Sequence, residues 1–383
     1  MRTKLKDICI INPKSPGFQD DLSVSFVPMS KIGEQGEFDP SEVRTYQEVK
    51  KGFTYFQNGD ILFAKITPCM ENGKGAVARS LENGVGFGST EFHVLRPLTE
   101  FVTSEWLFYL LNWQTFRKEA ERNMIGSAGQ KRVPKTFLEE YSVDIPVLEK
   151  QREMTNILNR VCNLISLRKQ QLAKLDELVK ARFVEMFGDP VSNSKYWNMC
   201  MLGERCKIIT GNTPPRTEPG NYGTFIEWIK SDNINTPHTY LTTAQEYLSK
   251  KGFEKSKYVD KGSLLMTCIA GSINCIGNIA ISDRMVAFNQ QINAIIPYDD
   301  DILYLYWMVF LSKPVIQNKV NNSLKGILSK AKLSTMKFPF PPHEIQAQFS
   351  SFCSKVEKQK LIIQRSFDRL EVLRKSLMQE YFR

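Results

Sequence analysis

Residues 149–187 read EKQREMTNILNRVCNLISLRKQQLAKLDELVKARFVEMF, and the fold of the chain follows from this stretch. Its apolar residues recur at spacings of three and four, which is typical of one face of a helix. Gly188-Asp189-Pro190 comes directly after the stretch and should end the helix. A helix of 39 residues with an apolar face along it needs a partner that covers this face.

The predicted partner is a second copy of the same element, residues 344–382, which read EIQAQFSSFCSKVEKQKLIIQRSFDRLEVLRKSLMQEYF. The two stretches match at one constant offset of 195 residues, from Glu149 and Glu344 to Phe187 and Phe382. A constant offset is typical of packed helices, because each inserted residue would rotate the apolar face by about 100°. We therefore expect an antiparallel coiled coil. Its predicted pairing residues are Ile157, Val161, Leu175, Leu178, Phe352, Val356, Leu370 and Leu373.

The regions before the two helices also resemble each other. The runs 59–66 and 262–269 each begin with a glycine and continue as an apolar strand, and the strand-like runs 91–97 and 291–297 both end at a proline. The offset drifts between 197 and 203 in these regions, as loop insertions would make it. Each region then has a short helix with a cap at Thr103-Ser104 or Asp300-Asp301. The aromatic residues of these helices are expected in the core: Trp106, Phe108, Tyr109, Tyr304, Tyr306, Trp307 and Phe310.

These patterns predict an α/β (α+β) chain with two similar globular domains, two long helices between and after them, and a pseudo-twofold internal repeat. The predicted domains are residues 1–148 and 188–341, and the predicted helices are residues 149–187 and 342–383. A chain of 383 residues is long enough to form two such cores.

The composition excludes several classes of protein. Hydrophobic residues make up 42% and charged residues 24% of the chain, as in folded globular proteins, so a disordered or collagen-like chain is excluded. We see no run of about 18 apolar residues and no apolar leader, so we expect a cytoplasmic protein without membrane contact. The eight cysteines form no C-x-x-C pair and the three histidines lie far apart, which predicts free thiols and no metal site.

The net charge of +10 is spread along the chain. Residues 1–148 carry −1, 149–187 carry +3, 188–341 carry +5 and 342–383 carry +3. A spread of basic charge allows a polyanion such as DNA to bind along a long surface. We find neither the glycine-rich loop and Asn/Asp-Pro-Pro-aromatic motif of an amine methyltransferase nor a P-loop or G-x-S-x-G, so the sequence predicts no catalytic residues.

The duplicated order of features, with the first helix closing on residues 181–190 (ARFVEMFGDP), resembles the DNA-specificity subunit of a type I restriction-modification enzyme over essentially the whole chain. The phrases 88–92 (GSTEF) and 228–232 (WIKSD) are also similar to this family. The second helix departs from the family pattern, because it ends in Glu380-Tyr381-Phe382-Arg383 without a Gly-Asp-Pro stop.

The resemblance implies a non-catalytic subunit with two target recognition domains, each reading one half of a bipartite, asymmetric site in double-stranded DNA. The two helices would set the gap between the halves and dock two modification (methyltransferase) subunits, which restriction subunits would join. S-adenosylmethionine, ATP and Mg would be bound only by those partner subunits, and this chain would hold no cofactor.

Candidate DNA contacts are polar side chains on predicted loops, because Lys, Arg, Ser and Thr bind phosphates while Arg, Asn, Gln and Lys read base edges. In the first domain they are Lys65, Thr67, Asn72, Lys74, Gln130, Lys131 and Arg132. In the second domain they are Asn212, Thr213, Arg216, Lys230, Ser231, Asn233, Ser272, Asn274 and Lys325. Asn72-Gly73 and Gly211-Asn212 are also ordinary turn signals, so a purely structural role stays open for them.

Two other functions stay open at this point. The chain could be a two-domain adaptor that binds proteins and carries its basic charge for solubility. It could also be a metal-dependent nuclease, since Asp39 followed by Glu48-Val49-Lys50 is similar to a metal-binding nuclease constellation.

Overall fold

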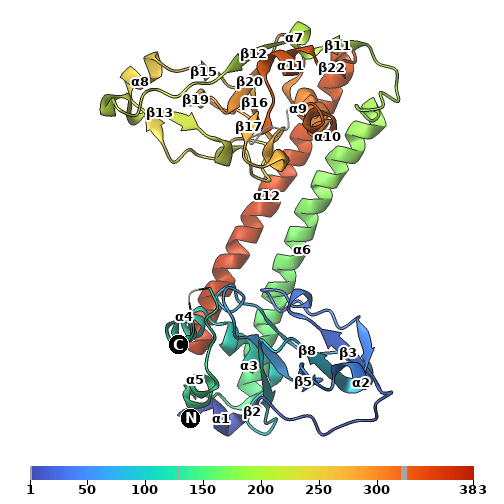
Figure 1. The fold of residues 1–383 in the computed structure, drawn as a ribbon, viewed down its shortest axis with the longest axis vertical. Coiled ribbons are helices and arrows are strands. Elements are labelled where there is room, and N and C mark those ends of the chain that lie inside the picture. Colours follow the sequence, from blue (N-terminus) through green and yellow to red (C-terminus); the bar gives the residue numbers. More distant parts are fainter. Residues whose placement is uncertain (1, 128, 321–325) are drawn as a thin grey trace. The chain divides into compact units, whose positions relative to one another are not determined.

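The computed structural model describes residues 2–127, 129–320 and 326–383. The chain forms two compact units: unit 1 holds residues 1–169 and 365–383, and unit 2 holds residues 170–364. The long helices α6 (Leu148–Phe187) and α12 (His343–Phe382) each contribute to both units (Figure 1). Helices and sheets are mixed in each unit, so the predicted fold class is confirmed.

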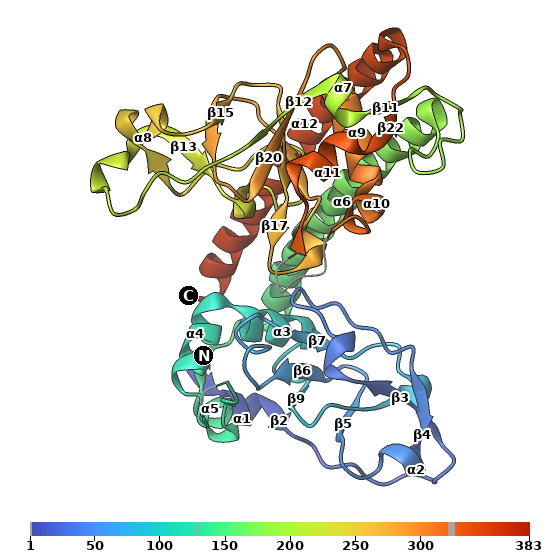
Figure 2. The same cartoon turned by 45° about the horizontal axis from the view of Figure 1, so that its top comes forward.

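Unit 1 is built on two four-stranded sheets (Figure 2). The first is antiparallel and has the order β2 (Cys9–Ile11), β9 (Phe92–Pro97), β6 (Ile61–Ala64) and β7 (Gly75–Val77). The second has the order β4 (Val43–Thr45), β3 (Ser23–Val27), β8 (Val85–Gly88) and β5 (Thr54–Gln57), and its pair β3·β8 is parallel. A small antiparallel pair, β1 (Arg2–Lys4) with β10 (Ser142–Asp144), joins the two ends of the region before α6.

Unit 2 repeats the two four-stranded sheets and the small terminal pair of unit 1, and adds one further pair of strands. Its first sheet has the order β12 (Cys206–Thr210), β20 (Ile292–Pro297), β16 (Leu264–Thr267) and β18 (Ile279–Ile281). Its second has the order β14 (Tyr247–Leu248), β13 (Tyr222–Ile229), β19 (Val286–Phe288) and β15 (Tyr258–Val259), again with one parallel pair, β13·β19. The pair β11 (Met199–Met201) with β22 (Lys337–Pro339) corresponds to β1·β10, and β17 (Ile269–Ala270) pairs with β21 (Gly326–Ile327). The internal repeat predicted from the sequence is therefore a repeat of topology.

The remaining elements are short helices. In unit 1 they are α1 (Leu5–Ile8), α2 (Tyr46–Val49), α3 (Ser104–Asn112), α4 (Gln114–Arg122), α5 (Lys135–Glu140) and the 3₁₀ turns η1 (Met29–Lys31) and η2 (Glu82–Gly84). In unit 2 they are α7 (Leu202–Arg205), α8 (Lys250–Glu254), α9 (Ile302–Leu311), α10 (Lys313–Gln317), α11 (Lys330–Thr335) and the 3₁₀ turns η3 (Pro219–Asn221), η4 (Ser231–Asn233) and η5 (Ile273–Cys275).

The strand β6 shows why the glycine-led runs are apolar at every position. Successive side chains of a strand point to opposite faces, and both faces of this strand are covered. Ile61 and Phe63 face a core shared with α3 and both long helices, whereas Leu62 faces a second core on the other side. In β16, Leu264 and Met266 face one core and Leu265 the other in the same way.

Segments of the two long helices pack beside each other in opposite directions within each unit. In unit 1 the Arg168 Nε donates to Ser366 Oγ at 3.2 Å, and Met154 of α6 shares a core with Phe382 of α12. In unit 2 the ring of Phe183 lies 5.4 Å from that of Phe349, and Asp176 pairs with Lys360. The chain after α6 turns at Gly188, whose φ of +78° is a conformation that favours glycine, and its N–H donates to the Val184 carbonyl at 2.8 Å.

Two fully buried glutamines, equivalent in the repeat, fasten the short helices α3 and α9 to the long ones. Gln151 Oε1 accepts from the Thr103 N–H at 2.9 Å, and its Nε2 donates to the Phe101 and Pro146 carbonyls. Gln346 Oε1 accepts from the Asp301 N–H at 2.9 Å, and its Nε2 donates to Asp300 Oδ1 and the Pro341 carbonyl. Thr103 and Asp301 also cap α3 and α9 with their side chains, as predicted.

Three sequence predictions differ from the structure. Phe310 is 44% exposed, because it lies at the end of α9 beyond the buried face and stacks on Tyr306 from outside. Leu178 and Leu373 are 47% and 45% exposed, so neither is buried as a pairing residue would be. In α6 the next residue, Val179, takes the buried position, because the helix periodicity of 3.6 shifts the inward face from the simple three-and-four count.

Candidate nucleic-acid interface

Three segments far apart in the sequence meet where β6 ends and β9 begins. The Lys65 N–H donates to the Glu91 carbonyl at 2.9 Å, and the Val133 N–H donates to the Lys65 carbonyl at 2.9 Å. The Thr67 N–H donates to the Lys131 carbonyl at 3.0 Å. The backbone therefore brings the predicted residues 65–67 and 130–132 together at one edge of unit 1.

The charges at this edge are paired in a specific way. Arg132 donates from Nε and Nη2 to the Glu91 carboxylate at 2.9 and 2.8 Å, a bidentate pair that holds the pKa of Glu91 below its ordinary value. Lys65 is half-buried beside this pair, and burial lowers its pKa, against the opposing effect of the Glu91 charge. Gln130 and Lys131 are exposed, so their polar groups face solvent at the edge.

The turn that follows β6 supplies the other predicted residues of unit 1. Asn72 is exposed at its tip. Lys74 is half-buried and donates to the Met29 carbonyl at 3.3 Å, while Thr67 Oγ1 donates to Glu71 Oε1 at 2.7 Å. Of this group, Asn72 is the exposed side chain, whereas Lys74 and Thr67 hold the turn in place.

Unit 2 has the same edge with different side chains. The Cys268 N–H donates to the Gln291 carbonyl at 2.8 Å, and the Leu328 N–H donates to the Cys268 carbonyl at 2.9 Å, as at Lys65, Glu91 and Val133 of unit 1. Gln291 thus takes the place of Glu91, and Cys268 that of Lys65. The predicted residue Lys325 lies outside the described residues.

Two predicted cations of unit 2 converge on one carboxylate. Arg216 Nη2 lies 2.9 Å and Lys230 Nζ 2.7 Å from Glu246 Oε2, and both cations lie over the Trp228 ring at 5.6 and 5.3 Å from its centre. The two hydrogen bonds, that from Lys230 first, hold the pKa of Glu246 below its ordinary value. Arg216 is exposed and Lys230 half-buried, so DNA phosphate could approach the same pair of cations.

Other predicted residues of unit 2 are engaged inside the protein. Asn212 donates to the Lys255 carbonyl at 2.7 Å and accepts from the Lys257 N–H at 2.6 Å. Asn233 is buried, accepts from the Lys230 N–H and donates to the Thr243 carbonyl, so its amide serves as a turn cap and is not placed to reach a base.

Thr213 donates to Gln290 Oε1 and the half-buried Ser231 lies 3.5 Å from Gln291 Oε1, so both also have partners within the unit. Ser272 and Asn274 are exposed on the turn that contains η5.

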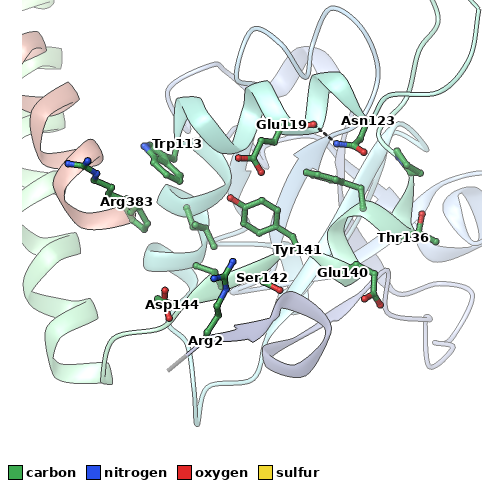
Figure 3. A pocket seen from close by; sticks show the side chains of 15 residues that line it. Arg2, Trp113, Glu119, Asn123, Thr136, Glu140, Tyr141, Ser142, Asp144 and Arg383 are labelled. Carbon is green, nitrogen blue, oxygen red and sulfur yellow. Dashed lines mark hydrogen bonds between the residues drawn. The ribbon is translucent and has the colours of Figure 1, made fainter.

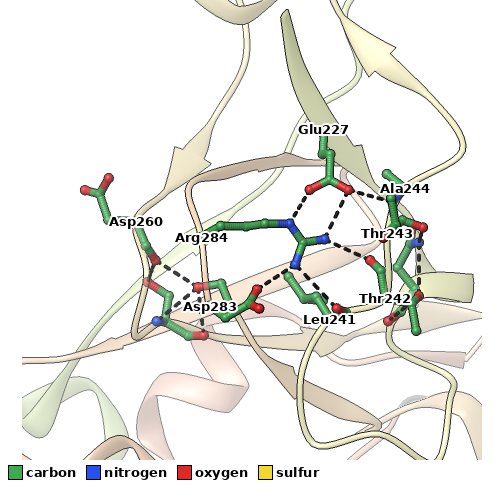
Figure 4. Close-up of polar contacts among 11 residues, drawn as sticks. Glu227, Leu241, Thr242, Thr243, Ala244, Asp260, Asp283 and Arg284 are labelled. Atoms are coloured by element: carbon green, nitrogen blue, oxygen red, sulfur yellow. Dashed lines mark hydrogen bonds and ion pairs between the residues drawn. The ribbon is translucent and has the colours of Figure 1, made fainter. Parts of the chain in front are cut away.

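Sequence reasoning missed the groups that hold these loops. Figure 4 shows the Arg284 guanidinium between the Glu227 carboxylate and the carbonyls of Leu241 and Thr242. Glu227 also accepts from the Ala244 N–H at 2.8 Å, which fixes the segment 241–244 that receives the Asn233 amide. Nothing local in the sequence marks such pairs, because the partners lie 17 to 57 residues apart.

A cavity of about 830 Å³ lies elsewhere in unit 1. Figure 3 shows Trp113, Glu119, Tyr141 and Arg383 around it. None of the predicted DNA contacts lines this cavity.

The residues of the nuclease alternative have other partners: Asp39 pairs with Lys31, and Glu48 accepts from Thr45 at 2.7 Å in a capping box. Within the described part of the chain, no group of three or more His, Cys, Asp and Glu could hold a metal ion, and the eight cysteines are free thiols. Of the helices described, none is long and apolar enough to span a lipid bilayer.

Comparison with known proteins gives consistent matches over both units. A family model described as the type I restriction modification DNA specificity domain matches residues 1–177 and again residues 194–372. The chain is 41% identical over 178 residues to the type I restriction enzyme EcoAI specificity subunit of Escherichia coli, a match that covers 45% of this chain and 30% of that protein. It thus spans less than a third of that relative's length. The putative type I restriction enzyme MjaX specificity subunit of Methanocaldococcus jannaschii is 21% identical, with 94% of this chain and 84% of that protein covered.

Two solved structures share the fold. The type I restriction-modification system S subunit from M. genitalium superposes with a TM-score of 0.61 at 14% identity, covering 100% of this chain and 96% of that chain. A chain from work on complex assembly and conformational transition of the type I R-M system has a TM-score of 0.59 at 19% identity, with coverages of 100% and 97%.

Proposed function

Because this chain belongs to the family of type I restriction modification DNA specificity domains, we propose that it is the non-catalytic DNA-recognition subunit of a type I restriction-modification complex in the cytoplasm. Each unit would read one half of a bipartite, asymmetric site in double-stranded DNA. The helices α6 and α12, which contribute to both units, would set the gap between the halves as an antiparallel coiled coil.

The observation that carries this proposal is the edge that occurs once in each unit. The same backbone hydrogen bonds hold Glu91 beside Lys65 in unit 1 and Gln291 beside Cys268 in unit 2. The Arg132 guanidinium held by Glu91 and the Gln291 amide offer different hydrogen-bonding groups, so two equal frames with different side chains suit two different half-sites. Cations around these frames, among them Lys131, would bind phosphates and place the frame on the duplex.

The chemistry would belong to partner proteins. We propose that two modification (methyltransferase) subunits dock on the helices and bring S-adenosylmethionine, and that restriction subunits with ATP and Mg join them. The repeat supports a pair of equal partners, because a duplicated surface offers the same contacts twice.

The test uses the full chain together with its modification subunits. Sequencing methylated bases in a host with and without the gene gives the motif, which should have two specific halves separated by a gap. The pair Gln130→Ala and Lys131→Ala should then weaken discrimination in one half, and the pair Arg216→Ala and Lys230→Ala in the other. Each phosphate contact removed should lower the salt dependence of binding by about one unit of slope.

Lys118, an exposed residue of α4, provides the control, and Lys118→Ala should leave both halves unchanged. A single contiguous motif, or one pair of variants that alters both halves, would contradict the two-unit assignment. Assembly with proteins but no salt-dependent DNA binding would favour the adaptor, and strand cleavage by the lone chain with a divalent metal would favour the nuclease.

A further inference from the structure

Arg117, on α4 of unit 1, is a buried cation without a carboxylate partner among the described residues. It is 7% exposed, and its guanidinium lies over the Phe63 ring at 4.4 Å from the ring centre. Burial lowers its pKa. A buried charge costs free energy unless its hydrogen-bonding groups are satisfied, so the structure must hold it for a local reason.

Arg117 donates from Nη2 to Asn112 Oδ1 at 2.5 Å, and its other partners are backbone carbonyls of one turn. Nη1 donates to the Met70 carbonyl at 2.9 Å, and Nη2 donates to the Gly73 carbonyl at 3.2 Å and to the Lys74 carbonyl at 3.4 Å. Gly75 lies against both the neighbouring strand and this side chain, because a Cβ atom there would lie 2.9 Å from the Leu62 carbonyl oxygen and 3.3 Å from Nη2. The turn held in this way, residues 70–74, carries the exposed Asn72 at its tip.

Unit 2 repeats the device with a different side chain. Gln317 of α10 donates from Nε2 to the Ile273 carbonyl at 2.9 Å and to the Ile276 carbonyl at 3.1 Å. In each unit two of the accepting carbonyls lie three residues apart, Met70 and Gly73 or Ile273 and Ile276, in the segment between the equivalent strands β6 and β7 or β16 and β18. The tip of the second turn carries Asn274, which is exposed as Asn72 is.

We infer that Arg117 and Gln317 are positioning residues that fix two equivalent DNA-reading turns, 70–74 and 273–277, with Asn72 and Asn274 at their tips. The inference rests on the proposed function. Arg117 and Gln317 hold carbonyl oxygens of the turns toward the interior, while the Asn72 and Asn274 amides lie at the surface. A turn already fixed in the free protein loses less conformational freedom on binding, and a mismatched base cannot be accommodated by a shift of the turn. Asparagine at such a tip can bond a base edge or a phosphate oxygen.

The repeat supplies the experiment. Arg117→Met keeps much of the length of the side chain but removes its donors, and it should reduce discrimination against mismatches in the half-site of unit 1 by about tenfold while the half-site of unit 2 is unchanged. Gln317→Met should do the reverse. Arg117→Lys keeps a cationic donor that extends beyond the position of Nε toward the same carbonyls, and should restore most of the discrimination. Binding to DNA with single mismatches is measured with the complete chain and its modification subunits.

Arg96→Lys is the matched control for stability. Arg96 makes a bidentate pair with the buried Asp60 in unit 1 and does not touch the turn, so this change should lower the melting temperature without a change in half-site discrimination. The inference is overturned if Arg117→Met keeps full discrimination in the half-site of unit 1. It is also overturned if Arg96→Lys loses as much of this discrimination as Arg117→Met at an equal melting temperature. If Arg117→Met does not fold, Gln317→Met decides the question, and full discrimination of that variant in the half-site of unit 2 would overturn the inference. A wild-type complex without sequence preference would refute the proposed function instead.

Discussion

His93 is a buried residue of β9, and both nitrogens of its ring form hydrogen bonds. Its Nε2 lies 2.8 Å from the Val133 carbonyl, which can only accept, so Nε2 carries the proton. Its Nδ1 accepts from Asn12 Nδ2 at 3.1 Å, and the Asn12 orientation is fixed because Oδ1 accepts from the Val94 N–H at 2.9 Å. Only the neutral imidazole satisfies both bonds.

This bonding predicts how the stability of unit 1 depends on pH. Burial lowers the pKa of His93 below its ordinary value of 6.5. Below pH 6.5 the unfolded chain therefore binds a proton at this position that the folded chain does not. The contribution of neutral His93 to the free energy of unfolding is fully present above this pH and falls as the pH is lowered. The loss is at most about 1.4 kcal/mol per pH unit. Denaturant unfolding between pH 7.5 and 5.5 should show this slope, and His93→Gln should flatten it.

The exposed His238 gives the comparison, since His238→Gln should retain the wild-type slope. Equal slopes for His93→Gln and the wild type would show that His93 does not carry the effect.

Single residues of the candidate interface are predictable when their chemistry is visible in the sequence, and not when it depends on a distant partner. The segments 65–67 and 130–132 were predicted as polar loops, and the structure brings them together. Glu246 and Arg117 had no local signal, because a carboxylate or guanidinium reads as a solvated side chain until the fold brings its partners near. Asn233 was predicted from its loop, but its amide caps a turn.

At the scale of elements, one buried glutamine connects each long helix to a short helix, Gln151 to α3 and Gln346 to α9, and substitution can test this connection. Gln346→Leu would remove three hydrogen bonds and leave the half-buried Asp301 N–H and the buried Pro341 carbonyl without a partner. We expect unit 2 to lose about 3 kcal/mol, since each buried group left unsatisfied costs about 1–3 kcal/mol. Denaturant unfolding measures this loss.

Gln359→Leu is the matched change on the exposed side of α12 and should alter stability by less than about 0.5 kcal/mol. An equal loss in the free energy of unfolding for the two substitutions would mean that the hydrogen bonds of Gln346 make no specific contribution to stability.

Elements were predictable where the pattern is local and long. The constant offset and the three-and-four spacing indicated both long helices, and the glycine-led apolar runs indicated β6 and β16. The order of strands was not predictable, because neighbours such as β2 and β9 lie more than 80 residues apart and pair through backbone groups that every residue has. The exposed Leu178 and Leu373 show the limit of counting spacings without the exact helical pitch.

At the scale of the whole molecule, the proposed spacing function makes a quantitative prediction. Seven residues inserted after Gln171, within α6, add about two helical turns and about 10 Å while rotating the following residues by only about 20°. At about 3.4 Å per base pair this length equals about three base pairs. Because α12 is not lengthened, we expect the gap of the methylated motif to grow by about one to three base pairs with both half-sites retained.

An insertion of three residues at the same place is the control, because it rotates the following residues by about 60° out of register and should disturb packing more while lengthening less. Methylation of the original motif with its original gap by an active seven-residue variant would show that the helices do not set the spacing.

The way unit 1 is composed has a consequence for biosynthesis. Its residues come from both sides of unit 2 in the chain, and Phe382 packs on Trp106 with ring centres 5.5 Å apart. A ribosome that adds about 5–20 residues per second needs roughly 10 to 40 s for the 195 residues 170–364. During that interval the nascent unit 1 presents Trp106 without the aromatic ring that covers it, while unit 2 already has all its residues before Phe382 is made. Unit 1 is therefore translated first but is the unit that closes last.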